Sequence, residues 1–271
     1  MVFPAVARLR ADVSAMAREI HDYRDLLAAL TRRDLMLRYK QTAMGVAWAV
    51  LGPVAQMLLF TVIFTKVTTL RTDLPYPVYA YAGLLPWNLT ASALRFATVS
   101  LTGNTALLNR TSFPREVLPL STVLVALVDF LVAATVLVGL MVYFGIGISW
   151  TVLLVPLVIL VQLSFTAGVA LLLAMANLFF RDVRHLVDVL ILVWMLASAV
   201  VYPIERIGGA LGRLFALNPM TPIIEAYRAV LLRGEPPAAL PFAYAATVAL
   251  VTLCIGWFLF HRAELRFAEN I

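Results

Sequence analysis

A stretch of 51 consecutive residues, 130–180, contains no Asp, Glu, Lys or Arg. A helix that crosses the roughly 30 Å hydrocarbon layer of a bilayer needs about 20 predominantly apolar residues, so this stretch is long enough for two crossings. Near its middle, Gly145 to Trp150 (GIGISW) supplies a tight turn. Backbone polar groups inside a bilayer must be satisfied within the spanning structure, which only helices and closed barrels achieve. The segment lengths favour helices, so the fold class expected is an all-α, polytopic integral membrane protein.

The overall composition supports this class. Hydrophobic residues make up 62% of the chain and charged residues 13%, whereas soluble domains carry about 25% charged residues. The net charge of +6 comes from Lys and Arg residues spread over connecting segments. A nucleic-acid-binding protein gathers such residues on one face, so we expect no nucleic-acid partner. The single cysteine, Cys254, lies in an apolar stretch and offers neither a disulfide nor a paired-thiol metal site.

Six largely uncharged stretches are expected to be transmembrane helices of one domain, residues 43–271. These stretches are 43–65, 79–97, 119–144, 151–178, 186–202 and 241–260. An even number of spans places both termini on the same side of the membrane. That side then carries 15 Lys and Arg residues and the opposite side six. Because Lys and Arg accumulate on the cytoplasmic side, both termini are predicted to be cytoplasmic.

The segment before the first span, residues 1–42, is too evenly charged to hold the apolar centre of a signal peptide, so we expect it to be retained. Within it, Tyr23, Leu26, Leu27 and Leu30 recur at helical spacing with charges on the other face. This pattern predicts an amphipathic helix lying in the headgroup plane at the cytoplasmic interface. A helix packed on its own protein is the alternative.

Residues 203–234 carry two apolar stripes separated by Asn218-Pro219. Each stripe covers about 10–12 residues, which is too short to cross a bilayer. The pair therefore predicts a re-entrant or interfacial helical hairpin on the outer face.

Motifs for enzymatic chemistry are absent from the sequence. It contains no phosphate-binding loop of the form G-x-x-x-x-G-K-[ST], no H-E-x-x-H and no Cys/His cluster. We therefore expect a chain that is not itself an enzyme and binds no cofactor or metal of its own. ATP and Mg²⁺, where needed, would be held by a separate partner subunit.

Asp129 is the one acid expected deep inside a span. It lies ten residues into the third predicted helix, which corresponds to a depth of about 15 Å. Intramembrane charges are costly to bury and are functional candidates by default. Two interpretations stay open: a carboxyl group that fixes helix packing, or an ion-coupling group of a secondary carrier. A carrier usually has several such groups, so the packing role is favoured.

Aromatic residues in or beside the spans are candidates for the wall of a channel. The set comprises Trp48, Phe60, Phe64, Trp87, Trp194 and Tyr202. Flat ring faces can contact the C–H faces of sugars without binding them tightly, so that a polymer can slide. The alternative is the aromatic belt that membrane proteins carry at both interfaces. Spacing alone does not choose between the two.

Five motifs, in order along the chain, resemble the membrane subunit of type-2 ABC exporters for polysaccharides, the O-antigen, capsule and teichoic-acid permeases. They are Arg33–Lys40 followed by Gly45, Trp48 and Pro53; Gly83-Leu84-Leu85-Pro86-Trp87; Asn104 to Pro114; Phe179-Phe180-Arg181-Asp182-Val183; and Asn218-Pro219 with Glu225, Tyr227 and Arg228. The resemblance implies a homodimer in the bacterial inner membrane, bound to two copies of an ATPase subunit, that exports a lipid-linked polysaccharide. It further implies that the first and fifth spans line the channel.

Site roles follow from this resemblance together with the chemistry of the residues. A surface segment around 105–113 is expected to dock on the ATPase, and cations at the cytoplasmic mouth can attract the phosphate of a lipid-linked substrate. Positive-inside anchoring explains the same cations. The docking set is Asn104, Leu107, Leu108, Arg110, Phe113, Arg181 and Asp182; the mouth set is Arg38, Tyr39 and Lys40; the outer-gate set is Asn218, Pro219, Glu225, Tyr227 and Arg228.

Other functions are compatible with the same sequence. A type-2 ABC permease for a drug or smaller lipid would share the fold but have a narrower channel or one without aromatic lining. An ion-coupled secondary carrier would depend on Asp129 and a proton gradient. A non-transporting membrane scaffold would have no solvent-filled path.

Overall fold

The computed structural model describes residues 22–40, 42, 44–67, 74–108, 113–204 and 207–267 of the 271-residue chain. No strand occurs within these ranges. The helices in chain order are α2 (Arg24–Tyr39), α3 (Ala47–Val62), η1 (Ile63–Val67), α4 (Tyr76–Ser100), η2 (Thr102–Asn104), α5 (Thr105–Leu108), α6 (Val117–Tyr143), η3 (Trp150–Leu154), α7 (Val155–Phe179), α8 (Val183–Ala197), α9 (Gly209–Ala216), α10 (Met220–Arg228), η5 (Ala229–Arg233) and α11 (Ala239–Phe267). The all-α fold class is confirmed for this part of the chain.

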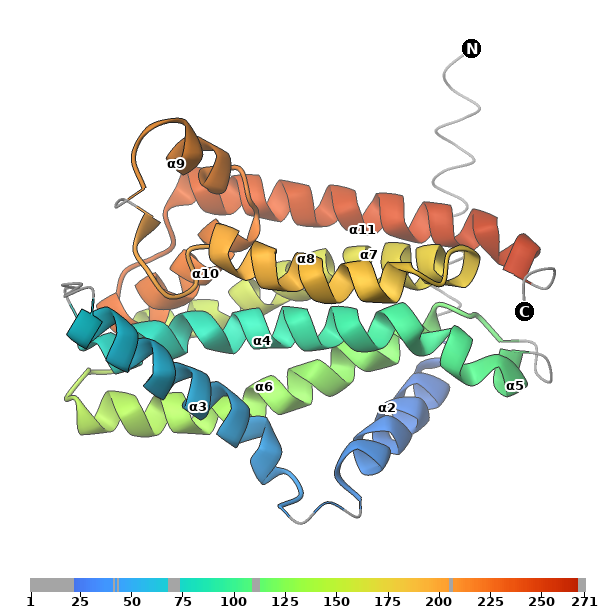
Figure 1. Ribbon diagram of the computed structural model, residues 1–271, viewed down its shortest axis with the longest axis horizontal. Helices are drawn as coiled ribbons and strands as arrows, with labels where there is room; N and C mark the ends of the chain where they lie inside the picture. Colours follow the sequence, from blue (N-terminus) through green and yellow to red (C-terminus); the bar gives the residue numbers. More distant parts are fainter. Residues whose placement is uncertain are drawn as a thin grey trace.

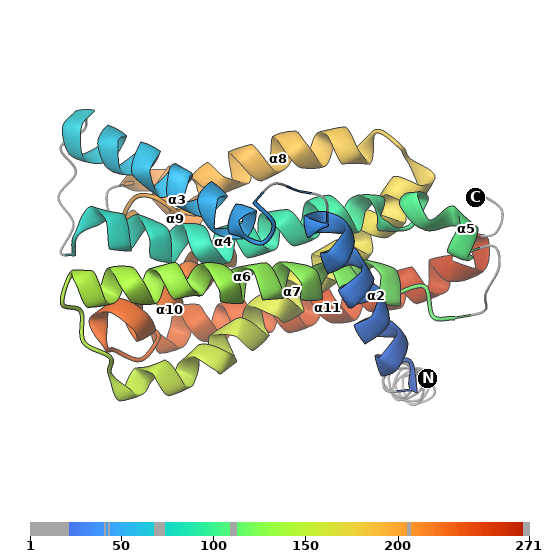
Figure 2. The ribbon, with the colours of Figure 1, turned by 90° about the horizontal axis from the view of Figure 1, so that it is seen from below.

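The long helices lie side by side and give the bundle two ends. Figure 1 shows α5 and the last turns of α11 at one end, which we call the α5 end. Helices α9 and α10 lie at the opposite end, called the α9 end. Helix α3 runs obliquely to the bundle and meets α4 at the α9 end, while α2 crosses α6 near the α5 end (Figure 2).

Four described helical stretches are long and apolar enough to cross a membrane: Ala47–Lys66, Val117–Tyr143, Trp150–Phe179 and Ala239–Ala263. They match the first, third, fourth and sixth predicted spans. The other two predicted spans are helical, yet neither meets the same criterion within the described residues. Helix α8 has only 15 residues, about 22 Å at a 1.5 Å rise, and α4 carries more polar residues than the others. The count of six spans therefore stays a prediction.

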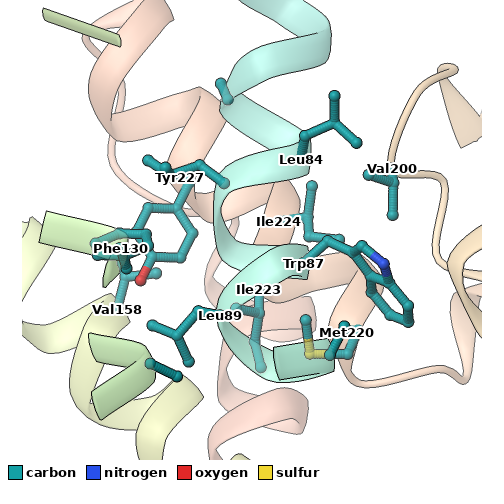
Figure 3. Close-up of a cluster of buried hydrophobic side chains, with 14 of the residues drawn as sticks. Leu84, Trp87, Leu89, Phe130, Val158, Val200, Met220, Ile223, Ile224 and Tyr227 are labelled. Atoms are coloured by element: carbon teal, nitrogen blue, oxygen red, sulfur yellow. The ribbon is translucent and has the colours of Figure 1, made fainter. Parts of the chain in front are cut away.

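Helix α4 is the centre of the bundle. It is continuous over 25 residues, longer than the 79–97 expected, because Pro77 sits in the first turn, where its missing N–H is tolerated, and Pro86 is accommodated within the helix. It packs against α3, α6, α7, α8 and α10. Most of its residues are buried, including Leu84, Trp87 and Leu89, which meet Ile223, Ile224 and Tyr227 of α10 in the core (Figure 3).

Close approach of α7 and α11 depends on glycine. A Cβ added at Gly168 would lie 2.6 Å from the backbone of Thr252 and Leu253, and one at Gly256 would lie 2.4 Å from the carbonyl oxygen of Gly168. Small residues let the backbones of membrane helices approach closely and gain van der Waals contact. These two glycines therefore set the distance between α7 and α11.

A buried polar knot joins α4, α7 and α10. The side-chain amide of Gln162 donates to the carbonyl oxygen of Pro86 (2.6 Å) and to Oγ1 of Thr90 (3.1 Å). The hydroxyl of Tyr227 donates to Oε1 of Gln162 (2.8 Å). Each of these buried polar groups thus has a hydrogen-bond partner on another helix. Such networks fix the register of the helices that carry them.

The predicted amphipathic stripe of α2 packs on the protein itself. Leu30 is buried, and Tyr23, Leu26 and Leu27 lie against the same cluster at the α5 end. Its other members include Leu101, Val117, Leu171, Leu178 and Phe260. The contacts follow the alternative interpretation, a helix packed on its own bundle, and the position of α2 in the headgroup plane stays a prediction.

The segment predicted as a hairpin contains two short helices, α9 and α10, which are separated at Leu217-Asn218-Pro219. Its re-entrant or interfacial position on the outer face stays a prediction. The two helices differ in burial. Helix α9 exposes Leu214, whereas α10 is inserted into the core and contacts α4, α7 and α11. Helix α10 thus anchors the hairpin to the bundle.

Candidate functional site

Asp129 is paired with two residues of α2. The guanidinium of Arg38 donates to Oδ2 of Asp129, and the hydroxyl of Tyr39 donates to Oδ1 at 2.5 Å. The Arg38 and Asp129 side chains are 19% and 18% exposed. Burial, followed by the hydrogen bond to Asp129, raises the pKa of Tyr39 to about 12, so its hydroxyl stays a donor throughout the physiological range. The carboxylate is therefore neutralised within the chain, as the packing interpretation of Asp129 expects.

A cavity of about 420 Å³, lined by both polar and apolar residues, adjoins this pair between α2, α3, α4 and α6. Gln56 and Asn88 face it and are joined by a 2.9 Å hydrogen bond from Nδ2 of Asn88 to Oε1 of Gln56. Ser92, Arg95 and Trp48 also line it. Guanidinium and amide groups in one cavity can hold phosphate or hydroxyl groups through charge-assisted and neutral hydrogen bonds.

The three residues predicted at the cytoplasmic mouth surround Asp129. Arg38 and Tyr39 bind it directly, and Lys40 lines a second cavity of about 610 Å³ together with Tyr39 and Asp129. About 90 positions separate these residues from Asp129 in the sequence, and no spacing motif connects them. The sequence offered one physical indication of this pairing, because a buried carboxylate requires a cation nearby.

The predicted channel aromatics fall into separate places. The rings of Phe60 of α3 and Phe64 of η1 are 6.2 Å apart, and Phe64 stacks on Tyr76 of α4 at 5.7 Å. Tyr76 lies 6.2 Å from Tyr79, whose ring lies 3.8 Å from the guanidinium carbon of Arg228. This aromatic ladder connects the exposed α3 to the buried α10 at the α9 end.

Trp194 packs its ring against the edges of two neighbours. It lies 5.7 Å from Trp87 and 5.9 Å from Phe165. Trp87 is only 2% exposed and belongs to the hydrophobic core of the single chain. Trp48 lies apart from both groups, beside the cavity near Arg38. Tyr202 donates to the carbonyl oxygen of Leu196.

Asn218 joins the hairpin to the end of α8. Its Oδ1 accepts from Nε1 of Trp194 (3.0 Å) and from the backbone N–H of Met220 (3.1 Å). Its Nδ2 donates to Oγ of Ser198 (2.8 Å) and to the carbonyl oxygen of Ala197 (3.1 Å). All four hydrogen-bonding positions of the amide are used. This predicted gate residue therefore ties the α9–α10 junction to the C-terminal end of α8.

The remaining predicted gate residues are anchors of α10. Tyr227 belongs to the polar knot, and Arg228 is 2% exposed, with Nη1 and Nη2 donating to the carbonyl oxygens of Ala199 and Val200. Glu225 pairs with Arg228 and Arg233 at 3.5 and 2.7 Å. Pro219 begins α10.

Two predicted docking segments meet at the α5 end. Thr102, Gly103 and Thr105 line a cavity of about 550 Å³ together with Arg181 from the turn between α7 and α8 and Arg184 from the first turn of α8. Asn104 caps this segment, donating from Nδ2 to the carbonyl oxygen of Ser100 (2.8 Å) and accepting from Arg33 of α2 (3.1 Å). The segment is thereby tied to α2.

The other docking candidates whose side chains the structure describes do not line this cavity. Phe113 packs on the cluster around Leu30, Leu107 is half-buried, and Asp182 begins α8. Of Leu108 only the backbone is described, and Arg110 lies outside the described residues.

Comparison with known proteins gives a match over most of the chain. Residues 25–232 match the model of the ABC-2 type transporter family. The chain belongs to this family. It is 33% identical to the O-antigen export system permease protein RfbA of Myxococcus xanthus over 94% of this chain and 99% of that protein. Identity is 30% to RfbA of Klebsiella pneumoniae, over 90% of this chain and 94% of that protein, and 25% to the polysialic acid transport protein KpsM of Escherichia coli, over 87% and 92%.

Membership of the ABC-2 type transporter family confirms the resemblance drawn from the five motifs. It makes the chain an integral membrane protein and the transport subunit of a transporter. The residues matched, 25–232, run from α2 to η5 and so include the Asp129 cluster, the two docking segments and the hairpin.

Sequence reasoning missed several residues that organise these sites. Gln162, Thr90, Gln56 and Asn88 were not singled out, although all are polar residues inside predicted spans. Uncharged polar residues in a span are the signal that would have found them, because an amide buried among apolar helices must bond to a neighbouring helix.

Proposed function

We propose that this ABC-2 type transporter is the channel-forming subunit of an ATP-driven exporter that moves a lipid-linked, O-antigen-like polysaccharide out of the cytoplasm across the bacterial inner membrane. The observation that carries the proposal is the match to O-antigen export permeases over nearly the full length of both chains. A capsule or teichoic-acid polymer is the alternative substrate, favoured by the similarity to a polysialic acid transport protein.

The functional unit in this proposal is a homodimer with six spans per chain and both termini in the cytoplasm. The homodimer is supported by the apolar faces that the single chain leaves uncovered on α3 and α8. The exposed side chains of the single chain include Leu58, Leu59 and Val62 of α3, and Val189, Leu190 and Val193 of α8. A second copy and the surrounding lipid would cover them, with α3 and α8 of both copies beside the path.

Two ATPase subunits, which hold ATP and Mg²⁺, would bind at the α5 end. The cavity between η2, α5 and the α7–α8 turn supports this assignment, because it offers two cations, Arg181 and Arg184, beside a short helix. Movement of η2 would reach α2 through the hydrogen bond between Asn104 and Arg33, and from α2 would reach Asp129 through Arg38.

The substrate would enter beside α2. The cavity with Arg38, Arg95, Gln56 and Asn88 supports this step, since its donors suit a phosphate and the first sugars attached to it. An ion-coupled carrier is disfavoured by the same geometry, because Asp129 is already bound by Arg38 and Tyr39.

The test is polymer export and ATP hydrolysis in proteoliposomes that contain the chain with its cognate ATPase. Phe60→Ala/Trp194→Ala should slow export while hydrolysis continues, because the rings guide the polymer and do not touch the nucleotide. Tyr143→Ala, at an 81% exposed position of α6, is the matched control. Failure of the wild-type chain to bind an ATPase or to support ATP-dependent movement of a lipid-linked glycan would exclude the proposal, and a response only to a proton gradient would favour the carrier.

A further inference from the structure

A cavity of about 640 Å³ lies at the α9 end, apart from the cavity beside Asp129. Its walls come from the segment after α8, the end of α9, α10, η5 and the start of α11. Ile204, Leu217, Pro222 and Phe242 give it a largely apolar surface. Its size is in the range of pockets that enclose a small organic molecule or the polar head and upper chain of a lipid.

Among the residues that the structure describes, one part of this lining carries four charged residues: Glu225, Arg228, Arg233 and Glu235. Glu225 lies 2.7 Å from Nη2 of Arg233 and 3.5 Å from Nη1 of Arg228, and Arg233 lies 3.7 Å from Glu235. These four described side chains are two cations and two anions, so their summed formal charge is zero. They therefore match a ligand that carries both charges better than one that carries a single charge.

One buried N–H donor of the Arg228 guanidinium, at Nε, has no hydrogen-bond acceptor among the described residues. The two terminal nitrogens of the same guanidinium donate to carbonyl oxygens. A buried donor without an acceptor is costly, and such groups in native proteins usually face a water, an ion or a ligand. A phosphate oxygen is the acceptor that a guanidinium binds best.

The rim of the cavity is apolar and exposed. Leu217 of the α9–α10 junction and Leu240 of α11 are both exposed, as is the neighbouring Leu214. In an integral membrane protein such side chains contact lipid, so an acyl chain can pass from the bilayer into the cavity without crossing water.

We propose that this cavity binds one zwitterionic phospholipid, with its phosphate on Arg228 and Arg233, its ammonium on Glu225 and Glu235, and an acyl chain along Leu217 and Phe242. Phosphatidylethanolamine fits best, because its ammonium retains N–H donors for the two carboxylates. The bound lipid would brace α10 and η5 against α11. In the orientation given under the proposed function, this lipid would come from the outer leaflet. The lipid binding itself does not depend on transport.

The test is lipid binding to the full purified chain in detergent, followed by native mass spectrometry during titration with one lipid at a time. We expect one molecule of phosphatidylethanolamine to bind per chain, with phosphatidylglycerol at least tenfold weaker. Ala238→Phe, which fills the cavity from an exposed lining position, should weaken binding at least tenfold. Ala243→Phe, at an exposed position of α11 outside the lining, is the matched control and should bind as the wild type does.

The headgroup assignment has its own variants. Glu235→Gln removes an anion that faces the ammonium and should narrow the preference for phosphatidylethanolamine over phosphatidylglycerol. Arg233→Gln should weaken both lipids. Circular dichroism and size-exclusion profiles equal to those of the wild type establish that each variant is folded.

The proposal would be overturned by the absence of saturable binding to the wild-type chain, by binding to the Ala238→Phe variant as tight as to the wild type, or by a preference for phosphatidylglycerol. Tighter binding of a polyprenyl phosphate than of phosphatidylethanolamine would also overturn it, and would assign the cavity to a lipid carrier. None of these results depends on an ATPase or a polysaccharide, so the failure of this inference is distinguishable from failure of the proposed export function.

Discussion

Arg38 and Asp129 join α2 to the middle of α6 although 91 positions separate them in the sequence. Tyr39 binds the second oxygen of the same carboxylate. The charge that sequence analysis placed alone in a span is thus held by the helix that precedes the first span. Helix α2 is also bound to Asn104 of η2 through Arg33. One helix therefore contacts both the candidate docking segment and the candidate cavity for substrate.

Asp129→Ala should destabilise the protein, because it leaves the guanidinium of Arg38 without its carboxylate. Loss of one partner from a buried pair costs about 3–5 kcal/mol, and we expect about 2–3 kcal/mol for this partly exposed one. Thermal or denaturant unfolding of the purified chain in detergent measures the change. Arg38→Met/Asp129→Leu should recover part of the loss. The exposed pair Arg24 and Asp25 provides the control, where Asp25→Asn should change stability by less than about 1 kcal/mol. A loss no larger than that of the control would show that the Arg38–Asp129 pair contributes little.

Gly83→Ala should disrupt the junction between α4 and α10. A Cβ at this position would lie 2.2 Å from the carbonyl oxygen of Val200 and 2.5 Å from Nη2 of Arg228, and we expect a loss of at least about 2 kcal/mol from overpacking. Gly139→Ala in α6 is the matched control, since a Cβ there meets no atom within 4 Å. That change should raise stability by up to about 1 kcal/mol through helix propensity. Equal unfolding temperatures for the two variants would contradict the close approach at Gly83.

Tyr227→Phe tests the polar knot. It removes the hydroxyl that donates to Oε1 of Gln162 and leaves a buried acceptor unsatisfied, which costs about 1–3 kcal/mol. The unfolding free energy in detergent should fall by that amount. Tyr143→Phe removes a hydroxyl from an exposed side chain and should change stability by no more than about 0.5 kcal/mol. A Tyr227→Phe variant as stable as its control would indicate that Gln162 finds another donor.

Asn218→Ala should loosen the hairpin at its junction with α8. The change removes the acceptor of the Trp194 Nε1–H and the donor to Ser198. Hydrogen exchange of the backbone amides in α9 should become faster, while that of α6, which does not contact the junction, stays unchanged. Trp194 fluorescence should shift as its indole N–H loses its partner. Unchanged exchange in α9 would mean that Asn218 does not hold the junction.

Local sequence patterns predicted the helices but not all of their partners. The two long uncharged stretches around Gly145 became α6 and α7, and the break at Asn218-Pro219 separated α9 from α10, as expected. The apolar stripe around Leu30 predicted a helix, and this stripe packs on the bundle. The sequence could not choose between bundle and membrane, because an amphipathic face fits either one. Trp87 is buried within the single chain, and its place on a channel wall stays a prediction, because aromatic type and depth do not distinguish a lining ring from a core ring.

Helical structure, the apolar spans and the family are readable in the chain itself, because a bilayer admits only segments whose length, apolarity and internal hydrogen bonds meet fixed physical limits. Which helix faces touch is a different matter. The pairing of Arg38 with Asp129, the knot at Gln162 and the charged cavity around Arg228 each join segments far apart in sequence. Such contacts depend on the packing of whole helices, and residue spacing within one helix carries no information about the face that a distant helix presents.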